Sequence, residues 1–391
     1  MTDLSLDSSA LHTFALSPEQ QACLLGRDPS RPDAGSHRLR IAVNASQGSA
    51  TFAAALQRYA AGQPVLGTRW LQVPGFLGWR QTCPSQGNAV RWVELDATAP
   101  ALTLEEGGVL AVSWRALSQD RCEVEFVAAA LALDPPSLER LAADVLASVE
   151  GRTPVSSDVD YEQYVQWRQD MAADEDAAQG RAYWQHAEVD PARGNALHLG
   201  VRGSPATPQA SRLDSQLAVP LSTLGAAQAV AEALGQPLDF VLQGLWWVLL
   251  GRLSGQQAFV GGWLHDCRSD YDHFEDTLGV FEKVLPLRVE LDPAALFAQW
   301  SQQAEGRLAD HLGWQEYCPI QSPTSTAPLR AGFAFEHARL APEQVLAYPS
   351  RPAFELLLRV RVWGGTLHLA IEASGAVYSV ASLEGLLEQL R

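Results

Sequence analysis

Apolar and polar residues alternate along residues 37–45, which is typical of a strand with one buried face. Residues 50–61 instead repeat their apolar positions at helical spacing and predict a helix. Short, mostly apolar runs predict further strands in the first half of the chain, at 66–73, 89–95, 108–114 and 122–130.

The helix expected over residues 135–150 has a well-marked apolar stripe. That stripe consists of Leu138, Leu141, Val145, Leu146 and Val149. Asp134 stands directly before Pro135 and Pro136. A carboxylate followed by prolines predicts a helix N-terminus, because the carboxylate caps free N–H groups and proline needs none.

The rest of the chain mixes both patterns. Helices are expected at 160–173, 176–187, 221–234, 237–253, 293–311 and 381–391. Strands are expected at 211–219, 257–263, 283–290, 329–336, 352–362 and 366–372. Residues 188–210 are rich in proline, glycine and alanine without any period, so they predict a connection. We therefore expect an α+β protein with an N-terminal lobe at 1–187, that connection, and a C-terminal lobe at 211–391.

Length and charge narrow the class of protein. The 391 residues exceed one ordinary core and favour two lobes. The formal charge of −17 argues against nucleic-acid partners and anionic membranes, since both need clustered basic residues. The most apolar run, residues 240–253, is interrupted by Gln243 and Gly244 and is too short to span a bilayer.

Cysteines and the first residues indicate the compartment. The five cysteines are scattered, with no CxxC pair and no Cys/His ligand spacing, so we expect neither a metal site nor a disulfide framework. The opening MTDLSLDSS has neither the basic nor the apolar region of a signal peptide. We therefore expect a cytoplasmic protein with reduced thiols.

Seven short segments of the chain resemble the conserved motifs of one protein family. Both their order and the distances between them fit that family. They are residues 17–21 (SPEQQ), 161–167 (YEQYVQW), 183–184 (YW), 260–268 (VGGWLHDCR), 278–288 (LGVFEKVLPLR), 315–317 (QEY) and 328–329 (PL). Each segment alone is a weak signal, and their shared order makes the match specific. Together they resemble the conserved motifs of the condensation domains of nonribosomal peptide synthetases.

That resemblance implies a chloramphenicol acetyltransferase-like fold, in which two similar lobes form a V-shaped pseudo-dimer around a tunnel. It also implies substrates that arrive as thioesters on the phosphopantetheine of a carrier protein, with no cofactor bound directly by the domain. In the family, the motif H-H-x-x-x-D-G lies at the middle of the tunnel, and its second histidine assists attack of the acceptor amine.

The histidines of that motif are missing here. Aligning Asp134 with the motif's aspartate places the two histidine positions on Ala129 and Ala130, and no histidine occurs between residues 38 and 185. Pro135 replaces the motif's glycine. Loss of a positioned base or acid typically lowers a rate by about 10²–10⁴, so the sequence favours binding over chemistry.

Asp134 has two interpretations that stay open, a helix N-cap and a structural ion pair. The resemblance offers Arg268 and Arg288 as candidate partners for that pair. Lys283 stands where the family usually has asparagine, and it is either a cation inside the tunnel that holds a carboxylate or phosphate, or a solvated surface lysine.

Other side chains are candidate substitutes for the missing base. The resemblance places His265 and His311 in segments that approach the cleft, with His337 after the last motif, and each is either a replacement base or an ordinary residue. Ser137 is the hydroxyl next to the old site, and its alternative role is that of a helix-surface serine.

Three functions follow. The first is a degenerate domain that resembles interface or oxygenase-recruiting domains and binds a carrier protein, a cytochrome P450 or a non-haem-iron hydroxylase. The alternative is residual condensation, an amide or ester formed by proximity alone. A small-molecule acyltransferase is the third. Whether the chain is free-standing or the N-terminal piece of a longer synthetase stays open, as do its partner, peptide product and oligomeric state.

Overall fold

The computed structural model describes most of the chain, and the fold is given for the described residues. They are residues 13–25, 35–83, 90–94, 102, 108–155, 157–190, 197, 199, 212–218, 221–319, 329–349, 354–375 and 377–390. The chain divides into two compact units, and each consists of several chain segments. The first unit comprises Met1–Met171, Cys267–Glu282 and Glu343–Pro349. The second unit comprises Ala172–Asp266, Lys283–Pro342 and Ser350–Arg391.

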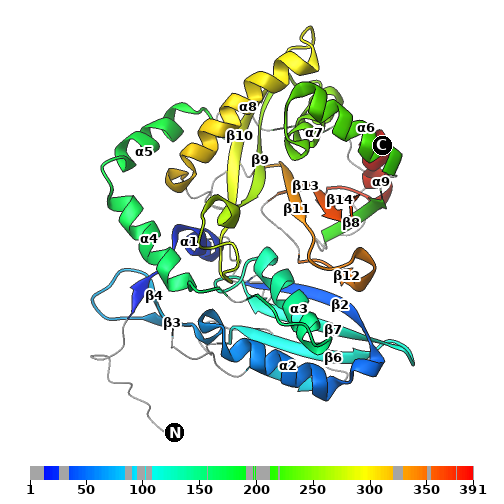
Figure 1. Ribbon diagram of the computed structural model, residues 1–391. Helices are drawn as coiled ribbons and strands as arrows, with labels where there is room; N and C mark the ends of the chain where they lie inside the picture. Colours follow the sequence, from blue (N-terminus) through cyan, green and yellow to red (C-terminus); the bar gives the residue numbers. More distant parts are fainter. Residues whose placement is uncertain are drawn as a thin grey trace. The chain divides into compact units, whose positions relative to one another are not determined.

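The first unit is built on a five-stranded sheet in the order β12-β2-β7-β6-β5 (Figure 1). Its strands are β2 (Ser36–Asn44), β5 (Arg91–Glu94), β6 (Leu110–Ala116), β7 (Arg121–Ala129) and β12 (Val345–Ala347). The pairing is antiparallel except between β5 and β6. Its helices are α1 (Pro18–Leu25), α2 (Ser49–Ala61), α3 (Pro135–Val149) and α4 (Tyr161–Ala173).

The two faces of this sheet differ in chemistry. Leu39 lies opposite Phe126 in the β2–β7 ladder, and both are fully buried on the face that meets α3. The opposite face carries charge, because strand residues alternate in direction. There Glu125 binds Arg38 at 3.2 Å and Glu123 binds Arg115 at 2.7 Å. The polar positions of these strands are therefore satisfied by ion pairs rather than by packing.

A small antiparallel sheet, ordered β1-β4-β3, completes the first unit. Its strands are β1 (Phe14–Ala15), β3 (Arg69–Gln72) and β4 (Trp79–Thr82). The hairpin of β3 and β4 buries Trp70 and Gln81 on one face. This sheet ties the start of the chain to the residues that follow α2.

The second unit is built on a six-stranded mixed sheet in the order β10-β9-β11-β13-β14-β8 (Figure 1). Its strands are β8 (Arg212–Ala218), β9 (Ala258–Asp266), β10 (Glu282–Glu290), β11 (Ala331–His337), β13 (Leu356–Trp363) and β14 (Thr366–Ser374). Its helices are α5 (Ala177–His186), α6 (Leu221–Leu234), α7 (Leu238–Ser254), α8 (Phe297–Gly313) and α9 (Val380–Leu390). The described 3₁₀ helices of both units are η1 (Ala45–Gln47), η2 (Pro64–Gly67), η4 (Cys267–Asp270), η5 (Gln315–Tyr317) and η6 (Pro342–Gln344).

Helix α7 lies in the core of the second unit. Trp246 and Trp247 are 0% and 1% exposed, and the indole Nε1 of Trp246 donates a hydrogen bond of 2.9 Å to the Gly332 carbonyl of β11. Because α7 is apolar on most sides, it is a buried helix. No helix among the described residues is both long enough and apolar enough to cross a membrane.

The α+β prediction is confirmed, and every helix and strand expected from the apolar patterns has a counterpart. The sequence missed α1 and the short strands β1, β4 and β12. Most of the predicted connection lies outside the described residues, which omit 191–196, 198 and 200–211. The lobe boundaries at 187 and 211 were drawn along the chain, whereas the compact units are discontinuous, and those boundaries stay a prediction.

Candidate functional site

The loop between β7 and α3 holds the two positions where the family motif has histidines. Strand β7 ends at Ala129, whose carbonyl accepts hydrogen bonds from the N–H groups of Ala132 (2.9 Å) and Leu133 (3.1 Å). The N–H of Ala130 donates to the Gly35 carbonyl at 2.9 Å. Ala129 and Ala130 are 2% and 9% exposed, so the motif survives as a tightly hydrogen-bonded turn with methyl side chains.

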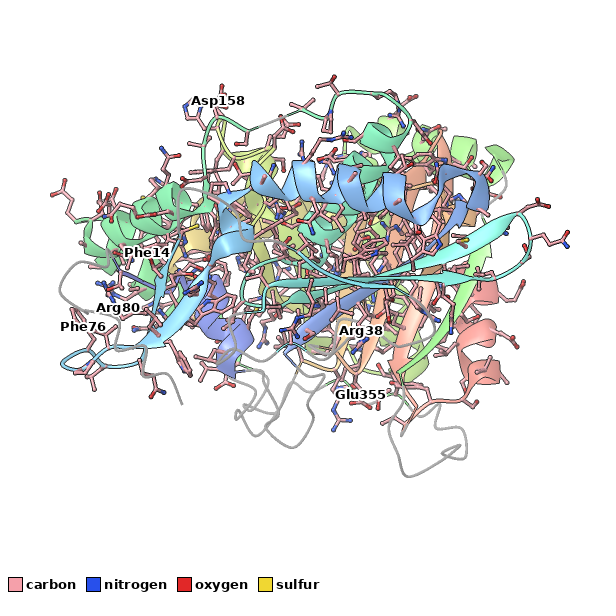
Figure 2. The ribbon with its side chains drawn as sticks, turned by 90° about the horizontal axis from the view of Figure 1, so that it is seen from below. Phe14, Arg38, Phe76, Arg80, Asp158 and Glu355 are labelled. Carbon is pink, nitrogen blue, oxygen red and sulfur yellow. The ribbon has the colours of Figure 1, made fainter. Side chains whose placement is uncertain are left out.

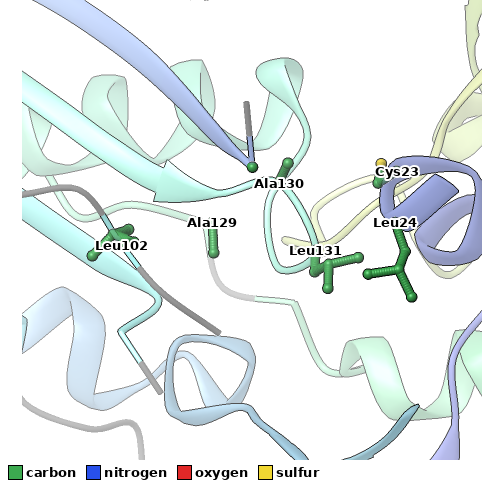
Figure 3. Close-up of a pocket in the computed structure, with 7 residues that line it drawn as sticks. Cys23, Leu24, Leu102, Ala129, Ala130 and Leu131 are labelled. Atoms are coloured by element: carbon green, nitrogen blue, oxygen red, sulfur yellow. The ribbon is translucent and has the colours of Figure 1, made fainter. Parts of the chain in front are cut away.

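A small hollow lies beside this turn (Figure 3). It is lined by Cys23, Leu24, Gly35, Leu102, Ala129, Ala130 and Leu131. Its volume is about 10 Å³, roughly the room that one water molecule needs. Burial raises the pKa of the Cys23 thiol to about 12, and the nearby Asp134 carboxylate adds to the shift. Cys23 is therefore an uncharged thiol at neutral pH and not a proton acceptor.

Asp134 is the centre of the polar interactions around the loop. Its Oδ1 accepts hydrogen bonds from the Ser137 N–H (2.8 Å) and the Arg268 guanidinium (2.7 Å). Its Oδ2 accepts from the N–H groups of Phe281 (2.7 Å) and Glu282 (2.9 Å). The side chain is 3% exposed. The carboxylate is therefore both the N-cap of α3 and half of an ion pair.

The ionisation of Asp134 follows from these contacts. Burial alone disfavours the charged form, but the Arg268 charge and the hydrogen bonds from Arg268, Phe281 and Ser137 outweigh it and lower the pKa of Asp134 below its ordinary value. Asp134 is therefore a firmly ionised structural anion. Its acceptor positions are occupied, so it is not available to take a proton from a substrate.

Of the two candidate partners for Asp134, the structure pairs it with Arg268. The Arg268 Nε also donates to the Thr277 carbonyl at 3.0 Å, and the guanidinium lies 4.4 Å from the centre of the Phe281 ring. Arg288 has other partners, Glu290 at 2.9 Å and Glu188 at 3.1 Å. Sequence position alone did not distinguish the two arginines.

Ser137 is neither exposed nor free to act as a nucleophile. Its Oγ donates to the Gly279 carbonyl (2.8 Å), accepts from the Gly279 N–H (3.0 Å) and also contacts Arg268. The residue is fully buried. A helix-surface serine was therefore the wrong expectation, because Ser137 fastens the first turn of α3 to the segment that leads into β10.

Two of the resembling segments lie beside the loop or its neighbouring segments. The Gln20 amide of α1 donates to the Leu131 carbonyl at 2.7 Å. The Ser17 hydroxyl lies 3.0 Å from that of Tyr161, which donates to the Val280 carbonyl at 3.0 Å. Residues 17–21 thus contact the motif loop directly, and Tyr161 joins them to the segment around Val280, a role that no signal in the sequence revealed.

Lys283 is buried, at 8% exposure, and is not a solvated surface lysine. Its Nζ donates to the Gln315 side-chain oxygen at 3.1 Å and lies 3.7 Å from the Glu316 carboxylate. The cation therefore joins β10 to η5. The family-like segment 315–317 supplies both of these partners.

The three histidines considered as substitute bases all belong to the second unit. His311 on α8 is 4% exposed; its Nδ1 contacts the Tyr183 hydroxyl, and its ring is stacked on Trp263. Burial lowers the pKa of His311 to about 4. His265 is half-buried at the end of β9, and His337 is exposed at the end of β11, with its ring against Phe335.

Backbone register identifies one further imidazole near the loop. His37 lies opposite Ala128 in the β2–β7 ladder, and Ser36 lies opposite Ala129. Directly opposed residues share a face and successive residues alternate, so His37 and Ala129 belong to opposite faces of the sheet. His37 is not among the residues that line the hollow. No group of three or more potential metal ligands occurs in the described part of the chain.

Comparisons with known proteins agree with this geometry. Residues 138–317 match the family model described as the condensation domain. A linear gramicidin synthase protein of Brevibacillus parabrevis is 30% identical over 118 residues, which cover 27% of this chain and 2% of that protein. The chain thus spans a very small share of that relative's length.

Solved structures share the fold across nearly the whole chain. The EpoB cyclization–docking bidomain of Sorangium cellulosum matches with a TM-score of 0.78 at 16% identity, covering 97% of this chain and 83% of that one. The condensation domain from the monacolin K polyketide synthase MokA matches with a TM-score of 0.76 at 14% identity, covering 97% and 96%. The family-model match and the fold agree: residues 138–317 belong to the condensation-domain family, and nearly the whole chain shares the fold of these solved structures.

Proposed function

We propose that this chain is a condensation domain that has lost acyl-transfer chemistry and serves nonribosomal peptide biosynthesis as a binding platform. The observation that carries the proposal is the pair Ala129 and Ala130 at the positions of the family histidines. A methyl group can neither accept a proton nor orient an amine. The platform would hold a carrier protein, a tailoring oxygenase, or both.

The surroundings of these alanines support the same conclusion. The residues that line the adjacent hollow offer one titratable side chain, the Cys23 thiol, and its raised pKa keeps it protonated at neutral pH. Asp134 and Ser137 already have partners at hydrogen-bonding distance on each side-chain oxygen. A general base needs a free acceptor within reach of the proton that it removes, and neither residue offers one.

The frame around the loop is retained although the histidines are absent. The Asp134–Arg268 pair, the Ser137–Gly279 hydrogen bonds and the Gln20 contact hold the turn in one conformation. Such buried polar interactions stabilise only when nearly every group is satisfied. These contacts keep the shape of the loop although no base is present. That combination fits a protein that binds partners rather than one that catalyses a reaction.

The proposed partners follow from the family. Condensation domains work on groups carried by the phosphopantetheine of a carrier protein, so this platform would bind no cofactor itself and would meet phosphopantetheine on its partner. The recruited enzyme would be a cytochrome P450 or a non-haem-iron hydroxylase that acts on the carrier-bound group. The described part of the chain offers no metal cluster of its own.

Binding is tested by calorimetry and gel filtration with the purified chain, a loaded carrier domain and an oxygenase, all from the same biosynthetic pathway. We expect a stable complex with the carrier, the oxygenase or both. If no partner associates with the chain, the platform proposal fails.

Chemistry is tested separately, by incubating the chain with donor-loaded and acceptor-loaded carriers and measuring product by mass spectrometry. We expect no more amide or ester than in the mixture without the chain. Product that survives Arg152→Glu but disappears with His37→Ala, His265→Ala or His311→Ala would establish residual condensation instead. Arg152→Glu serves as the control, because that side chain is 67% exposed and lies outside the buried interactions around the loop.

A further inference from the structure

Charge is distributed very unevenly along this acidic chain. Residues 34–93 contain no aspartate or glutamate. They contain six arginines, Arg38, Arg40, Arg58, Arg69, Arg80 and Arg91. The chain as a whole has a formal charge of −17, so the remaining residues together carry −23. Arg38 and Arg40 lie beside Glu125 and Glu123, so the positive character of the segment comes from its other arginines, which include Arg69 and Arg80 of the β3–β4 hairpin.

Among the described residues of this segment, the most exposed large apolar side chains lie at the turn between β3 and β4. Phe76 is 55% exposed and Leu77 is 104% exposed. Figure 2 shows Phe76 and Arg80 at the outer end of this hairpin. Single exposed apolar residues are common on protein surfaces, but two adjacent ones at a projecting turn form a contact point.

The turn is held in one conformation. Gly75 and Gly78 have φ angles of +89° and +83°, a region that residues with a side chain disfavour. The N–H of Phe76 donates to the Val73 carbonyl at 3.1 Å. The Arg80 guanidinium lies 4.5 Å from the centre of the Phe76 ring, a cation–π distance.

The register of the hairpin defines its outer face. Leu71 lies opposite Arg80, and Arg69, two residues before Leu71, therefore points to the same side. Trp70 points to the other side and is buried at 3% exposure. No ion pair within the described part of the chain involves Arg69. The hairpin surface consists of Arg69, Leu71, Phe76, Leu77 and Arg80.

We propose that the hairpin surface is the docking site for a protein partner with an acidic surface and an apolar recess. Charge complementarity selects an acidic partner, and Phe76 and Leu77 would enter the recess. A turn that is already ordered loses little conformational freedom on binding. Nucleic acids offer no apolar recess for Phe76 and Leu77, and an anionic membrane is tested below as the alternative occupant.

The inference rests on the proposed function in one respect, because the probe that tests it is a phosphopantetheinylated carrier domain of net negative charge. Calorimetric titration of this carrier measures Kd for the wild-type chain and for two variants. One variant combines Phe76→Ser with Leu77→Ser, and the other is Arg69→Glu. We expect each variant to raise Kd at least about tenfold, which corresponds to about 1.4 kcal/mol of binding free energy. We also expect added salt to weaken binding by the wild type more than binding by Arg69→Glu.

Matched controls use exposed residues away from the hairpin. Leu117→Ser removes a 46% exposed leucine at the β6–β7 turn, and Arg152→Glu reverses an arginine whose side chain is 67% exposed. Both controls should bind as the wild type does. Circular dichroism and the urea midpoint of each hairpin variant should also match the wild type, since the altered side chains are exposed.

The outcomes separate this inference from the proposed function. If the wild type binds the carrier and both hairpin variants bind equally well, the docking site is overturned and the platform stands. If the wild type does not bind the carrier, the docking site is overturned together with carrier binding. Hairpin-dependent sedimentation with phosphatidylserine vesicles, or hairpin-dependent self-association in ultracentrifugation, would likewise overturn the proposed acidic partner.

Discussion

Asp134 is buried, pairs with the Arg268 cation and accepts two backbone hydrogen bonds on one oxygen. Replacing it with a neutral side chain should therefore lower the free energy of unfolding. In Asp134→Asn, an amide would face either the Arg268 guanidinium or the N–H groups of Phe281 and Glu282, and donors would oppose donors. Breaking a buried ion pair typically costs about 3–5 kcal/mol. We expect a loss of that order in the free energy of unfolding by urea. A variant as stable as the wild type would contradict the role given to this carboxylate.

The pH dependence of the same variant follows from the lowered pKa of Asp134. The carboxylate contributes its full stabilisation above its unfolded pKa of about 3.9. That contribution is lost as the pH falls through the lower, folded pKa. The stability difference between wild type and Asp134→Asn should therefore stay constant from about pH 7 to about pH 5 and shrink only below about pH 4.

His311 gives a pH dependence of the same sign but in a higher pH window, because burial keeps its imidazole neutral. Its pKa falls from about 6.5 in the unfolded chain to about 4 in the fold. Between these values the unfolded chain binds the extra proton, so stability decreases as the pH falls through that window, by up to about 3 kcal/mol. Urea unfolding of His311→Gln should lack this decrease. An unchanged pH profile in the variant would show that another group causes it.

Only some residues of the candidate site could be predicted from the sequence. The order of the motifs identified the positions of Ala129, Ala130 and Asp134, because all three belong to one short motif. The choice between Arg268 and Arg288 depended on a pairing across more than a hundred residues, which no local pattern encodes. The donors at Phe281 and Glu282 are backbone groups and have no signature in the amino-acid types.

At the scale of elements, periodicity predicted the long helices and central strands, and it missed short ones. Strand β12 has three residues and pairs with β2, about three hundred positions earlier in the chain. Helix α1 has no apolar stripe, because Glu19 and Gln20 are its buried residues. Both elements are specified by long-range polar or backbone contacts, which hydrophobic spacing does not report.

The contact between β10 and η5 depends on Lys283, the only lysine in the chain. Burial should shield its amine from N-hydroxysuccinimide esters. Intact mass spectrometry of the native protein should therefore show labelling at the terminal amine alone, with a second label appearing in urea. Lys283→Arg should show a single label under both conditions. Rapid double labelling of the native wild type would mean that β10 and η5 separate readily.

At the scale of the whole molecule, the compact units do not follow the chain order. The first unit takes Cys267–Glu282 and Glu343–Pro349 from the second half of the sequence. The sequence patterns predicted a division at 187, because a stretch rich in proline and glycine follows that residue. Composition predicts where a connection falls along the chain, but it does not reveal which later segment returns to complete an earlier core.

This interleaving makes a fragment of residues 1–187 the sharpest test of the architecture. The fragment lacks Arg268 and the carbonyl and N–H groups of Gly279, so the buried Asp134 and Ser137 lose their partners. The lost interactions, about 3–5 kcal/mol for the ion pair alone, approach the total stability of about 5–15 kcal/mol typical of a domain. We expect no cooperative urea transition in near-ultraviolet circular dichroism, and recovery of one when residues 188–391 are co-expressed. A fragment that unfolds cooperatively at the midpoint of the full chain would show that the returning segments are dispensable, and the Asp134–Arg268 pair would then no longer explain the retained frame.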